Sequence, residues 1–578
     1  MTLLLRYLAH TFDSWYIALK NFRQRSWRTS LTNWIEYKGI GVEGNSFSNL
    51  FTEYLRGDAG VEKFFNGDFR NPSDWSSLLK SVERLPRNRS KLVQILTEQN
   101  KNFQCGVHTL ANIDLLLNEN TFAVVTGQQV GILSGPLYTV YKALTTIKLA
   151  QTLGSQFPDS KFVPIFWLES EDHDLAEAAS VTHIDQTNEL RSTTFLVPGA
   201  SEGKNLGAVG SIKFDASMTT FLDSLEQSLI QTEFKQGIFT LLRTAYQPGM
   251  TFTQSFVHLL NALLEDSGLI FFDPNDAGFK KLLVPIFRRE LETTPRSSQL
   301  VIERSVELEK QFHAQVKPRS INLFLHHHGG RYPLEPHPTN EFVLKGTRQY
   351  LSRTELNAML ESAPEQFSPN VVLRPLCQDF LLPTVAYIAG PSEVAYFAQF
   401  GSLYKDFNIP MPIIYPRASA TIVEEKVEKV LNRFSLQPAE FFVDLEAIKQ
   451  RVAEQVSDFK VEELFNSTVN SIEESLNSLR GGIQAIDQTL LPVLDGTLGK
   501  VKQSVGMLKE KTVAAQKRQH EVFLRQIDKA ALHLFPNNNF QERELNVVYF
   551  LNKFGPEFVR WLGGEIQIDK FKHQIIQM

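Results

Sequence analysis

The chain has 578 residues, enough to fill more than one hydrophobic core, so two or three domains are expected. Its formal net charge of −5 gives no reason to expect nucleic acid as a partner. The two cysteines, Cys105 and Cys377, are too few for a disulfide framework or a thiolate metal site, and no metal site is expected. No apolar run approaches the roughly 18 residues of a membrane-spanning helix, so a cytoplasmic protein without a membrane partner is predicted.

The first 45 residues differ from the rest of the chain. They are basic and hold three of the six tryptophans. Arg6 and His10 interrupt their apolar start and no small-residue cleavage site follows, so a signal peptide is not expected. An extra helix, or an upstream start codon chosen in error, would explain this N-terminal extension. From residue 46 the pattern is that of a globular protein, with helices predicted across Val61–Leu117.

A strand–helix–strand unit is predicted between residues 122 and 168. Phe122–Val125 is a short, β-branched apolar run, which favours a buried strand. From Leu137 to Leu153 apolar residues recur three and four positions apart, which predicts a helix with one apolar face. Phe162–Leu168 is again a short apolar run. Such a unit belongs to a parallel sheet with a right-handed crossover, and ligands of these sheets bind beyond the carboxyl ends of the strands.

A polar loop punctuated by glycines joins the first strand to the helix. Glycine lets the backbone approach a ligand closely, and the start of a helix favours a carboxylate or phosphate. The candidate substrate-binding residues here are Gln128, Gln129, Gly131, Ser134, Gly135, Tyr138 and Lys142. The loop matches neither GxGxxG nor the Walker A pattern. A purely structural strand-to-helix turn is the alternative interpretation.

Four acid or imidazole side chains, Glu171–Asp174, follow the second strand. Acidic residues packed after a buried strand repel one another unless they bind something. They suit a general base for an amine, a clamp for an ammonium group, or ligands for a divalent metal. The alternative is an acidic first turn of the next helix with Asp174 as its N-cap. Asp172, His173 and Asp174 are the candidate catalytic residues, and Trp167 in the preceding strand is a candidate substrate-binding residue.

Residues 181–345 are expected to form inserted segments of mixed structure. Leu269–Asp273 is a further short buried strand that ends in an acid, and Asn322–Arg331 is typical of a hairpin with a Gly-Gly turn. Because His326, His327 and His328 would alternate between the faces of a strand, they are predicted to be exposed polar residues rather than ligands of one metal ion. The other predicted elements are strands at 181–185 and 190–199 and helices at 217–242 and 254–265.

A second polar cluster is predicted at the same edge of the sheet. Thr384–Gly390 is another strand that runs into a glycine turn and a helix, with Glu393 in the first helical turn. Arg374 is a candidate partner for a carboxylate or phosphate, and a structural ion pair is its alternative role. Glu393 would recognise an amine or hydroxyl, or would simply favour the helix dipole. Gly390, and Arg417 at the end of a last predicted strand, complete the candidate substrate-binding residues.

The C-terminal third carries a heptad-like apolar seam. Between Val469 and Leu490, and again between Leu498 and Thr512, apolar residues alternate three and four positions apart. Two long helices folded back as an antiparallel coiled hairpin are predicted, and the apolar area of such a seam predicts a homodimer. A hairpin without dimerisation is the alternative. Beyond Phe535 a small helical return to the core is predicted.

Five long motifs stand out: VVTGQQVGILSGPLYTVYK, VPIFWLESEDHD, FSPNVVLRPLCQDFLLPTVAYIAGPSEVAYFAQF, PMPIIYPRAS and LFPNNNFQERELNVVYFL. In this order they resemble the bacillithiol-synthesis cysteine-adding enzymes, the BshC family, from about residue 45 to the end. The resemblance implies an α/β fold, with a Rossmann-like parallel-sheet core, inserted connecting segments and a C-terminal antiparallel α-helical coiled-coil arm. The expected division is an N-terminal extension at 1–45, a catalytic core at 46–420, a coiled-coil dimerisation arm at 421–532 and a C-terminal helical return at 533–578.

The resemblance implies a cysteine ligase that adds cysteine to glucosaminyl malate, through an amide bond, in the last step of bacillithiol synthesis. An amide made from a free carboxylate needs activation, for which ATP or another nucleotide is the usual means. The core is also broadly similar to class I aminoacyl-tRNA synthetases. Gly135–Tyr138 stands where those enzymes carry His-x-Gly-His, but neither this motif nor their Lys-Met-Ser-Lys-Ser loop occurs here.

Roles for the candidate residues follow as hypotheses. The loop up to Tyr138, with its two glutamines, holds the sugar malate or an activated carboxylate. Asp172 and Asp174 orient or deprotonate the acceptor amine, and His173 is the general base because imidazole titrates near neutral pH. The cations that neutralise malate or phosphate are Lys142 and Arg374. Two other classes of function stay open, namely a nucleotide- or sugar-nucleotide-binding transferase on the same sheet and a non-catalytic dimeric coiled-coil scaffold.

Overall fold

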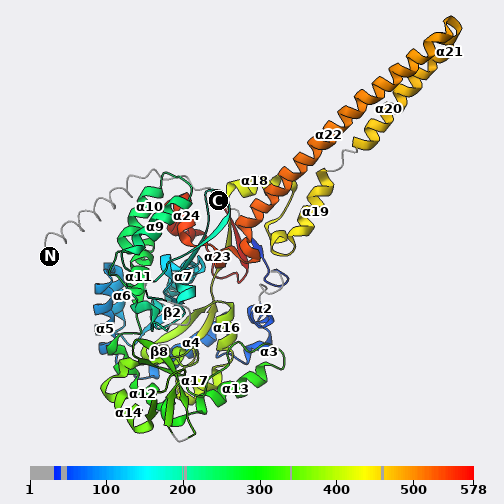
Figure 1. The fold of residues 1–578 in the computed structure, drawn as a ribbon. Helices are drawn as coiled ribbons and strands as arrows, with labels where there is room; N and C mark the ends of the chain where they lie inside the picture. Colours follow the sequence, from blue (N-terminus) through cyan, green and yellow to red (C-terminus); the bar gives the residue numbers. More distant parts are fainter. Residues whose placement is uncertain (1–31, 41–47, 198, 201–204, 339–340, 457–460) are drawn as a thin grey trace.

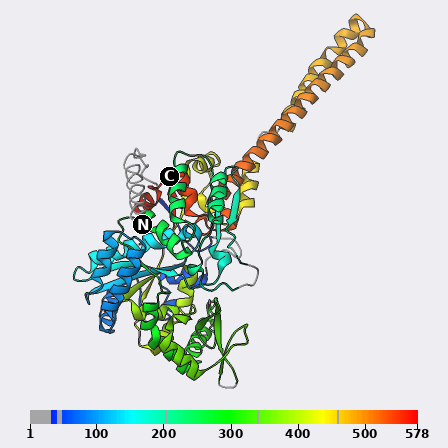
Figure 2. The ribbon, with the colours of Figure 1, turned by 60° about the vertical axis from the view of Figure 1, so that its left-hand side comes forward.

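The computed structural model describes residues 32–40, 48–197, 199–200, 205–338, 341–456 and 461–578. The two explanations of the N-terminal extension rest mainly on residues outside this part of the chain. A body of helices and sheets carries one long helical arm, which points away from the body in both views (Figure 1 and Figure 2). Within the described residues, no helix is both long and apolar enough to cross a membrane.

A five-stranded parallel sheet lies at the centre of the body. The strands follow the order β13–β12–β2–β3–β6, and every neighbouring pair is parallel. Their bounds are β2 Thr121–Gln129, β3 Lys161–Glu169, β6 Ile270–Phe272, β12 Thr384–Ala389 and β13 Ile413–Pro416. Counted along the chain, this is the 3-2-1-4-5 arrangement of a Rossmann sheet. The order reverses between β2 and β12, and such switch points are where these sheets bind ligands.

Apolar side chains on both faces of the sheet belong to two cores. Trp167 and Phe272 lie in one core, whereas their neighbours Phe166 and Phe271 lie in the other. Because successive residues of a strand point to opposite faces, an uninterrupted apolar run fits a strand that is covered on both sides. The helix α7 (Tyr138–Gln156) packs along β2 and β3. The predicted strand–helix–strand unit is therefore confirmed.

Helices before β2 and an insertion between β3 and β6 surround this sheet. The predicted helices across residues 61–117 are confirmed. The N-terminal helices are α2 Asn49–Arg56, α3 Ala59–Glu62, α4 Pro72–Arg84, α5 Arg89–Asn102 and α6 Val107–Leu115. The insertion contains α8 Leu175–Ala178, β4 Ser180–Ile184, β5 Leu190–Thr194, α9 Ser217–Ser228, α10 Lys235–Ala245 and α11 Phe252–Leu263.

A second insertion, between β6 and β12, carries a five-stranded antiparallel sheet of order β10–β9–β8–β7–β11. The inserted segments expected at 181–345 are divided in two by the predicted strand β6, which joins the central sheet. The predicted hairpin is confirmed as β7–β8, but only His328 of its three histidines is exposed, and His326 and His327 are half-buried. The elements are α12 Ala277–Thr293, α13 Arg296–Leu308, β7 Leu323–His327, β8 Gly330–Pro336, β9 Glu341–Leu344, β10 Tyr350–Ser352, α14 Arg353–Ser362, β11 Phe367–Pro369 and α15 Arg374–Leu381.

A three-stranded sheet joins distant parts of the chain. β15 (His573–Gln577) pairs antiparallel with β1 (Thr32–Ile35) and parallel with β14 (Ser419–Val423). β1 falls within the stretch expected as an extension, and β15 falls within the return that was expected to be helical. Pairing between segments so far apart leaves no local signal in the sequence. The remaining elements of the body are α16 Pro391–Phe397, α17 Gly401–Phe407, α23 Gln541–Glu544, α24 Val547–Phe554 and α25 Phe558–Glu565.

The arm is the predicted antiparallel hairpin. Its helices are α20 (Val461–Ser478) and α22 (Leu491–Leu534), which pack side by side along the arm (Figure 1). The turn between them is formed by the short helix α21 (Arg480–Ile486) and the residues up to Leu490. At the base of the arm, α18 (Glu425–Phe434) and α19 (Leu445–Val456) pack against α22.

Candidate active site

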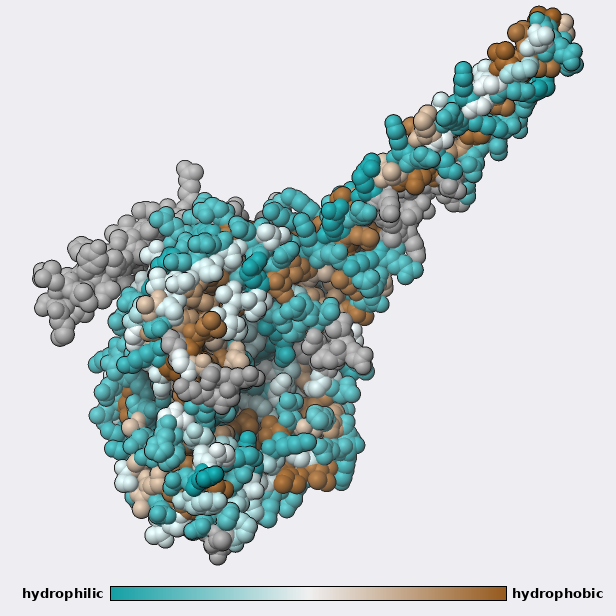
Figure 3. Space-filling view, viewed as in Figure 1, coloured by the Kyte–Doolittle hydropathy of each residue, from teal (hydrophilic) through white to brown (hydrophobic). Residues whose placement is uncertain are grey.

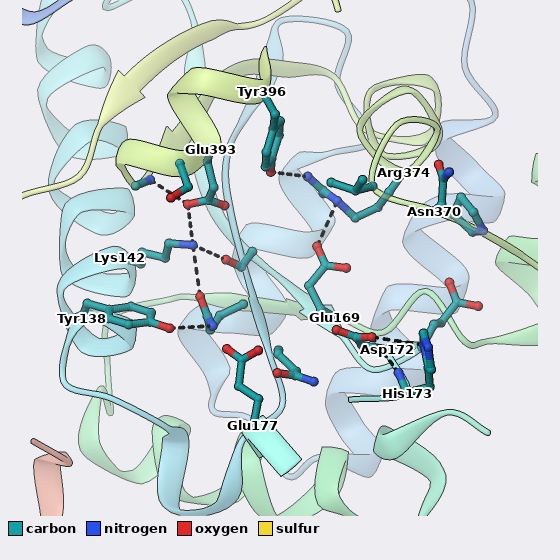
Figure 4. Close-up of a pocket in the computed structure, with 18 of the residues that line it drawn as sticks. Tyr138, Lys142, Glu169, Asp172, His173, Glu177, Asn370, Arg374, Glu393 and Tyr396 are labelled. Carbon is teal, nitrogen blue, oxygen red and sulfur yellow. Dashed lines mark hydrogen bonds and ion pairs between the residues drawn. The ribbon is translucent and has the colours of Figure 1, made fainter. Parts of the chain in front are cut away.

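The crevice at the carboxyl end of the central sheet opens into a cavity of about 780 Å³. Residues that follow β2, β3, β12 and β13 line it, together with residues of the β7–β8 hairpin and of the C-terminal return. In Figure 4, labelled side chains from α7, the end of β3, α15 and α16 face one another. The predicted site residues that line the cavity are Gln128, Gln129, Tyr138, Lys142, Asp172, His173, Arg374, Gly390, Glu393 and Arg417.

Lys142 on α7 is buried at the back of this cavity. Its Nζ lies 2.6 Å from Glu393 Oε2 and donates to the Gly127 carbonyl at 2.8 Å and to Gln128 Oε1 at 3.1 Å. Burial lowers the pKa of Lys142, and the neighbouring Glu393 carboxylate opposes that change. Because an ammonium group has three N–H bonds and three protein acceptors surround this one, Lys142 holds its neighbours in place and has no free N–H bond for a ligand anion.

A second buried ion pair joins Arg374 to Glu169. Arg374 Nε lies 3.0 Å from Glu169 Oε1, and its Nη2 lies 3.4 Å from the hydroxyls of both Tyr387 and Tyr396. Tyr387 in turn donates to Glu393 Oε1 at 2.8 Å. The Tyr387 hydroxyl therefore links the two ion pairs into one network across the switch point.

Gly127 leaves the space in which this network fits. A Cβ atom at this position would lie 3.1 Å from the Tyr387 hydroxyl and 3.2 Å from Glu169 Oε1. Both contacts are tighter than ordinary van der Waals contact, so the side chains would have to move. The close approach of the Tyr387 and Glu169 side chains thus explains why glycine occupies position 127.

Glu169 is the group in the cavity whose titration suits proton transfer. The pKa of Glu169 is raised to about 7, chiefly by burial; the charge of Arg374 lowers it, and those of Asp172, Glu393 and Glu171 raise it. Such a carboxyl group exchanges protons near neutral pH. Glu169 was not among the predicted site residues, because it is the last residue of β3, one position beyond the predicted apolar run Phe162–Leu168.

The four residues Glu171–Asp174 are divided among different tasks. Glu171 forms an ion pair with the buried Lys280. This is a structural role and not one of the catalytic roles predicted for these four residues. Asp174 caps α8 by accepting from the Glu177 backbone N–H at 3.1 Å, as its alternative interpretation predicted, and it does not line the cavity.

Asp172 and His173 reach the cavity wall. Asp172 Oδ1 accepts from the His173 backbone N–H at 2.7 Å and lies 3.5 Å from His173 Nδ1. Although burial raises the pKa of Asp172, hydrogen bonds from His173 and the charge of Arg331 lower it below its ordinary value overall. Asp172 is therefore a carboxylate at neutral pH, and Arg331 Nη1 lies 3.3 Å from the same imidazole nitrogen.

Arg417, which also lines the cavity, is held by a buried ion pair. Its Nη2 donates to Glu542 Oε1 at 2.7 Å, and both residues are buried. Its guanidinium lies 5.3 Å from the centre of the Tyr138 ring. Arg543, which sequence reasoning also missed, is exposed beside it on the C-terminal return and lines the cavity.

The other predicted substrate-binding residues lie behind the cavity. Trp167 is fully buried and its ring stacks on Phe272 at 4.5 Å. The loop with Gly131, Ser134 and Gly135 is held from behind, because the Asn546 side chain donates to the Leu133 and Gly135 carbonyls at 2.9 and 2.7 Å. None of these four predicted residues lines the cavity. In the described part of the chain no group of three or more His, Cys, Asp or Glu residues is placed to hold a metal ion.

These features define a Rossmann-type protein whose switch-point cavity is lined by charged side chains. Two sequence-family models match the chain: "Bacillithiol biosynthesis BshC, N-terminal Rossmann-like domain" at residues 35–418, and "Bacillithiol biosynthesis BshC, C-terminal coiled-coil domain" at residues 420–578. The chain belongs to the BshC family.

Relatives from three bacteria are similar over almost their whole length. Those from Salinibacter ruber and Chloroherpeton thalassium are each 37% identical to the chain, and that from Chlorobaculum tepidum is 36% identical. The matches cover 92%, 94% and 92% of this chain and 96%, 99% and 97% of the respective relatives. Each relative carries the name "Putative cysteine ligase BshC".

Proposed function

We propose that this protein is a cysteine ligase, which joins the carboxyl group of cysteine to the amine of glucosaminyl malate in the last step of bacillithiol synthesis. Membership of the BshC family and the name shared by its relatives support a cysteine ligase. The observation that carries the proposal is Glu169, a cavity-lining carboxyl group with a pKa of about 7.

The charges of the cavity match the proposed substrates. Glucosaminyl malate carries one amine and two carboxylates, and cysteine carries one of each. The cavity is lined by acidic groups, among them Glu169 and Asp172, and by cationic groups from separate segments, with Arg331 on the hairpin and Arg543 on the C-terminal return. An amine near the acids and carboxylates near the cations would be held in complementary surroundings.

Glu169 is the proposed general base. An amine attacks a carboxyl carbon only when neutral, so its ammonium form must first lose a proton. Glu169 would accept this proton, after which the C–N bond forms and one carboxyl oxygen of cysteine leaves with an activating group. Asp172 would orient the ammonium group before transfer. His173 is the second candidate, but its Nδ1 already lies within 3.5 Å of both Asp172 and Arg331.

Titration calorimetry separates this proposal from the two alternatives. The purified protein is expected to bind glucosaminyl malate and cysteine. A non-catalytic scaffold would bind neither, and a sugar-nucleotide transferase would instead bind a uridine nucleotide. Titration of cysteine into protein saturated with glucosaminyl malate, with and without ATP, would show whether a nucleotide takes part.

The arm is proposed to join two copies of the chain. Figure 3 shows apolar residues scattered along the arm to its tip. Ile486 is 83% exposed at the turn, and Val493 and Leu508 on α22 are 62% and 58% exposed. Apolar side chains on a narrow helical hairpin are costly in water, and a second arm packed against the first would cover them.

A further inference from the structure

Arg331 is a buried cation that the protein holds rigidly at the cavity wall. It is 5% exposed, and it belongs to β8 of the hairpin. Its Nε donates to Ser368 Oγ at 2.8 Å and its Nη2 donates to the Pro369 carbonyl at 2.8 Å. The guanidinium carbon lies 3.8 Å from the centre of the Phe324 ring. These contacts fix both the position and the plane of the guanidinium.

The charge of Arg331 has no carboxylate partner among the described residues. The acids on this wall are already engaged, because Glu171 pairs with Lys280 and Glu169 pairs with Arg374. Glu171, Asp172 and Glu169 act on Arg331 only from beyond ion-pairing distance. A buried charge without a partner is costly, so a site of this kind indicates that a ligand supplies the counter-charge.

The N–H bonds of Arg331 leave room for such a ligand. Of its five N–H bonds, two point to Ser368 and Pro369, and a third faces His173 Nδ1 at 3.3 Å. Two remain, one on each terminal nitrogen, which is the fork that a carboxylate accepts. By contrast, the guanidinium of Arg374 faces Glu169 and that of Arg417 faces Glu542.

Two further cations lie on the same wall of the cavity. Lys317 and Arg319 line it from the segment that precedes β7, and both are exposed. Arg319 lies 3.6 Å from Glu335, whereas the structure places no carboxylate within ion-pairing distance of Lys317 among the described residues. This wall therefore suits a ligand with more than one negative charge.

We propose that Arg331 anchors a carboxylate subsite, completed by Lys317 and Arg319, which holds the malate group of the acceptor. This inference rests on the proposed function. The malate carboxylates survive the reaction unchanged, whereas the cysteine carboxyl group must lose an oxygen atom. A fork that grips both oxygens of a carboxylate suits the group that stays intact and would oppose the reaction of the other. Of the three cations on this wall Arg319 lies near Glu335, so the two malate carboxylates match the two that have no carboxylate partner among the described residues.

The test compares Arg331→Met with Arg348→Met. Arg348 lies in the same insertion, between β9 and β10, and does not line the cavity. Both variants and the unaltered protein are titrated with glucosaminyl malate, with free malate and with cysteine. Arg331→Met is expected to weaken the binding of glucosaminyl malate and of malate about a hundredfold, as for loss of a charge-assisted pair. Cysteine binding should change less than about twofold, and Arg348→Met should match the unaltered protein.

Each other outcome overturns one claim. Unchanged affinity of Arg331→Met for glucosaminyl malate would contradict the subsite, and selective loss of cysteine binding would assign the subsite to cysteine. If the unaltered protein binds neither glucosaminyl malate nor cysteine, the proposed function fails instead. Should Arg331→Met not fold, the exposed pair Lys317→Met and Arg319→Met decides by the same titration, with about a tenfold loss for glucosaminyl malate expected and no loss contradicting the proposal.

Discussion

At the scale of single residues, Glu169 and His173 are the two candidates for the general base. Both lie at the cavity, but only Glu169 combines burial, an arginine partner and a pKa raised to about 7. His173 is exposed, and the guanidinium of Arg331 lies 3.3 Å from its Nδ1. The prediction of His173 as base therefore stands as the second candidate behind Glu169.

Replacement of Glu169 by glutamine tests this order. Glutamine can still accept from Arg374 but cannot take up a proton, so kcat is expected to fall about 10²- to 10⁴-fold with a smaller change in KM. Since the base acts only when deprotonated, the rate of the unaltered protein should rise with pH and level off above about 7, and this step should vanish in Glu169→Gln. A similar loss in His173→Ala, with normal turnover by Glu169→Gln, would give the role to His173.

Single-residue roles could be predicted only where the local pattern contains them. Asp174 as a helix cap and Glu393 in a first helical turn follow from neighbouring residues alone. Arg331 stands 158 residues beyond His173 along the chain, and no spacing rule connects the two. The partners of Lys142 could not be predicted either, because they come from the end of one strand and from a helix far along the chain.

The contact between β2 and its neighbours sets the shape of the site at the scale of elements. Gly127→Ala should push apart Tyr387 and Glu169, since its Cβ would lie 3.1 and 3.2 Å from their oxygens. Turnover is expected to fall about tenfold to a hundredfold, as for small displacements of reacting groups. Gly154→Ala on α7 is the control, because no atom lies within 4 Å of its added Cβ. Equal turnover by the two variants would contradict this role of Gly127.

Glu424 links three elements at the base of the arm. Its side chain faces His533 on α22 and Tyr549 and Lys553 on α24. Although burial raises the pKa of Glu424, His533 and Lys553 lower it to about 2 from the ordinary value of 4.5. The carboxylate thus contributes about 3 kcal/mol to the free energy of unfolding above pH 4.5, and this contribution is lost as the pH falls towards 2.

Glu424→Gln should therefore lower the free energy of unfolding by about 3 kcal/mol at pH 7 and by about half as much at pH 3.5. The measurement is urea unfolding of both proteins at each pH. Glu425, the exposed neighbour of Glu424, pairs with Lys429. Glu425→Gln, the control, should therefore lower the free energy of unfolding by less than about 1 kcal/mol. A difference between Glu424→Gln and the unaltered protein that stays constant with pH would rule out this linkage.

Elements were predictable where periodicity is strong and local. The short apolar runs gave β2, β3 and β12, and spacings of three and four gave α7 and the arm helices. The pairing of β1 with β15 was not predictable, because it joins opposite ends of the described chain. The turn of the arm was also open, since the heptad pattern continues through Ile483 and Ile486 into residues that form the tip.

The whole molecule combines a catalytic body with a long arm. α22 has 44 residues, so it extends about 66 Å. Val493→Glu combined with Leu508→Glu should convert a dimer to a monomer, because charges would be buried between the arms. Light scattering should change from twice the chain mass of 65.7 kDa to a single mass. Val306→Glu on the body, where Val306 is 58% exposed, should leave the dimer intact. A monomer before any substitution would contradict dimerisation through the arm.

The most direct test of the central claim is product formation by the purified protein from glucosaminyl malate and cysteine whose carboxyl group carries two ¹⁸O atoms. Mass spectrometry should detect the amide product with one ¹⁸O retained. If ATP is the activator, the second ¹⁸O should appear in AMP or phosphate and the product should require ATP. Loss of product in Glu169→Gln would place the chemistry in the described cavity. Absence of the amide under all these conditions, from protein that binds both substrates, would contradict the proposed ligase activity.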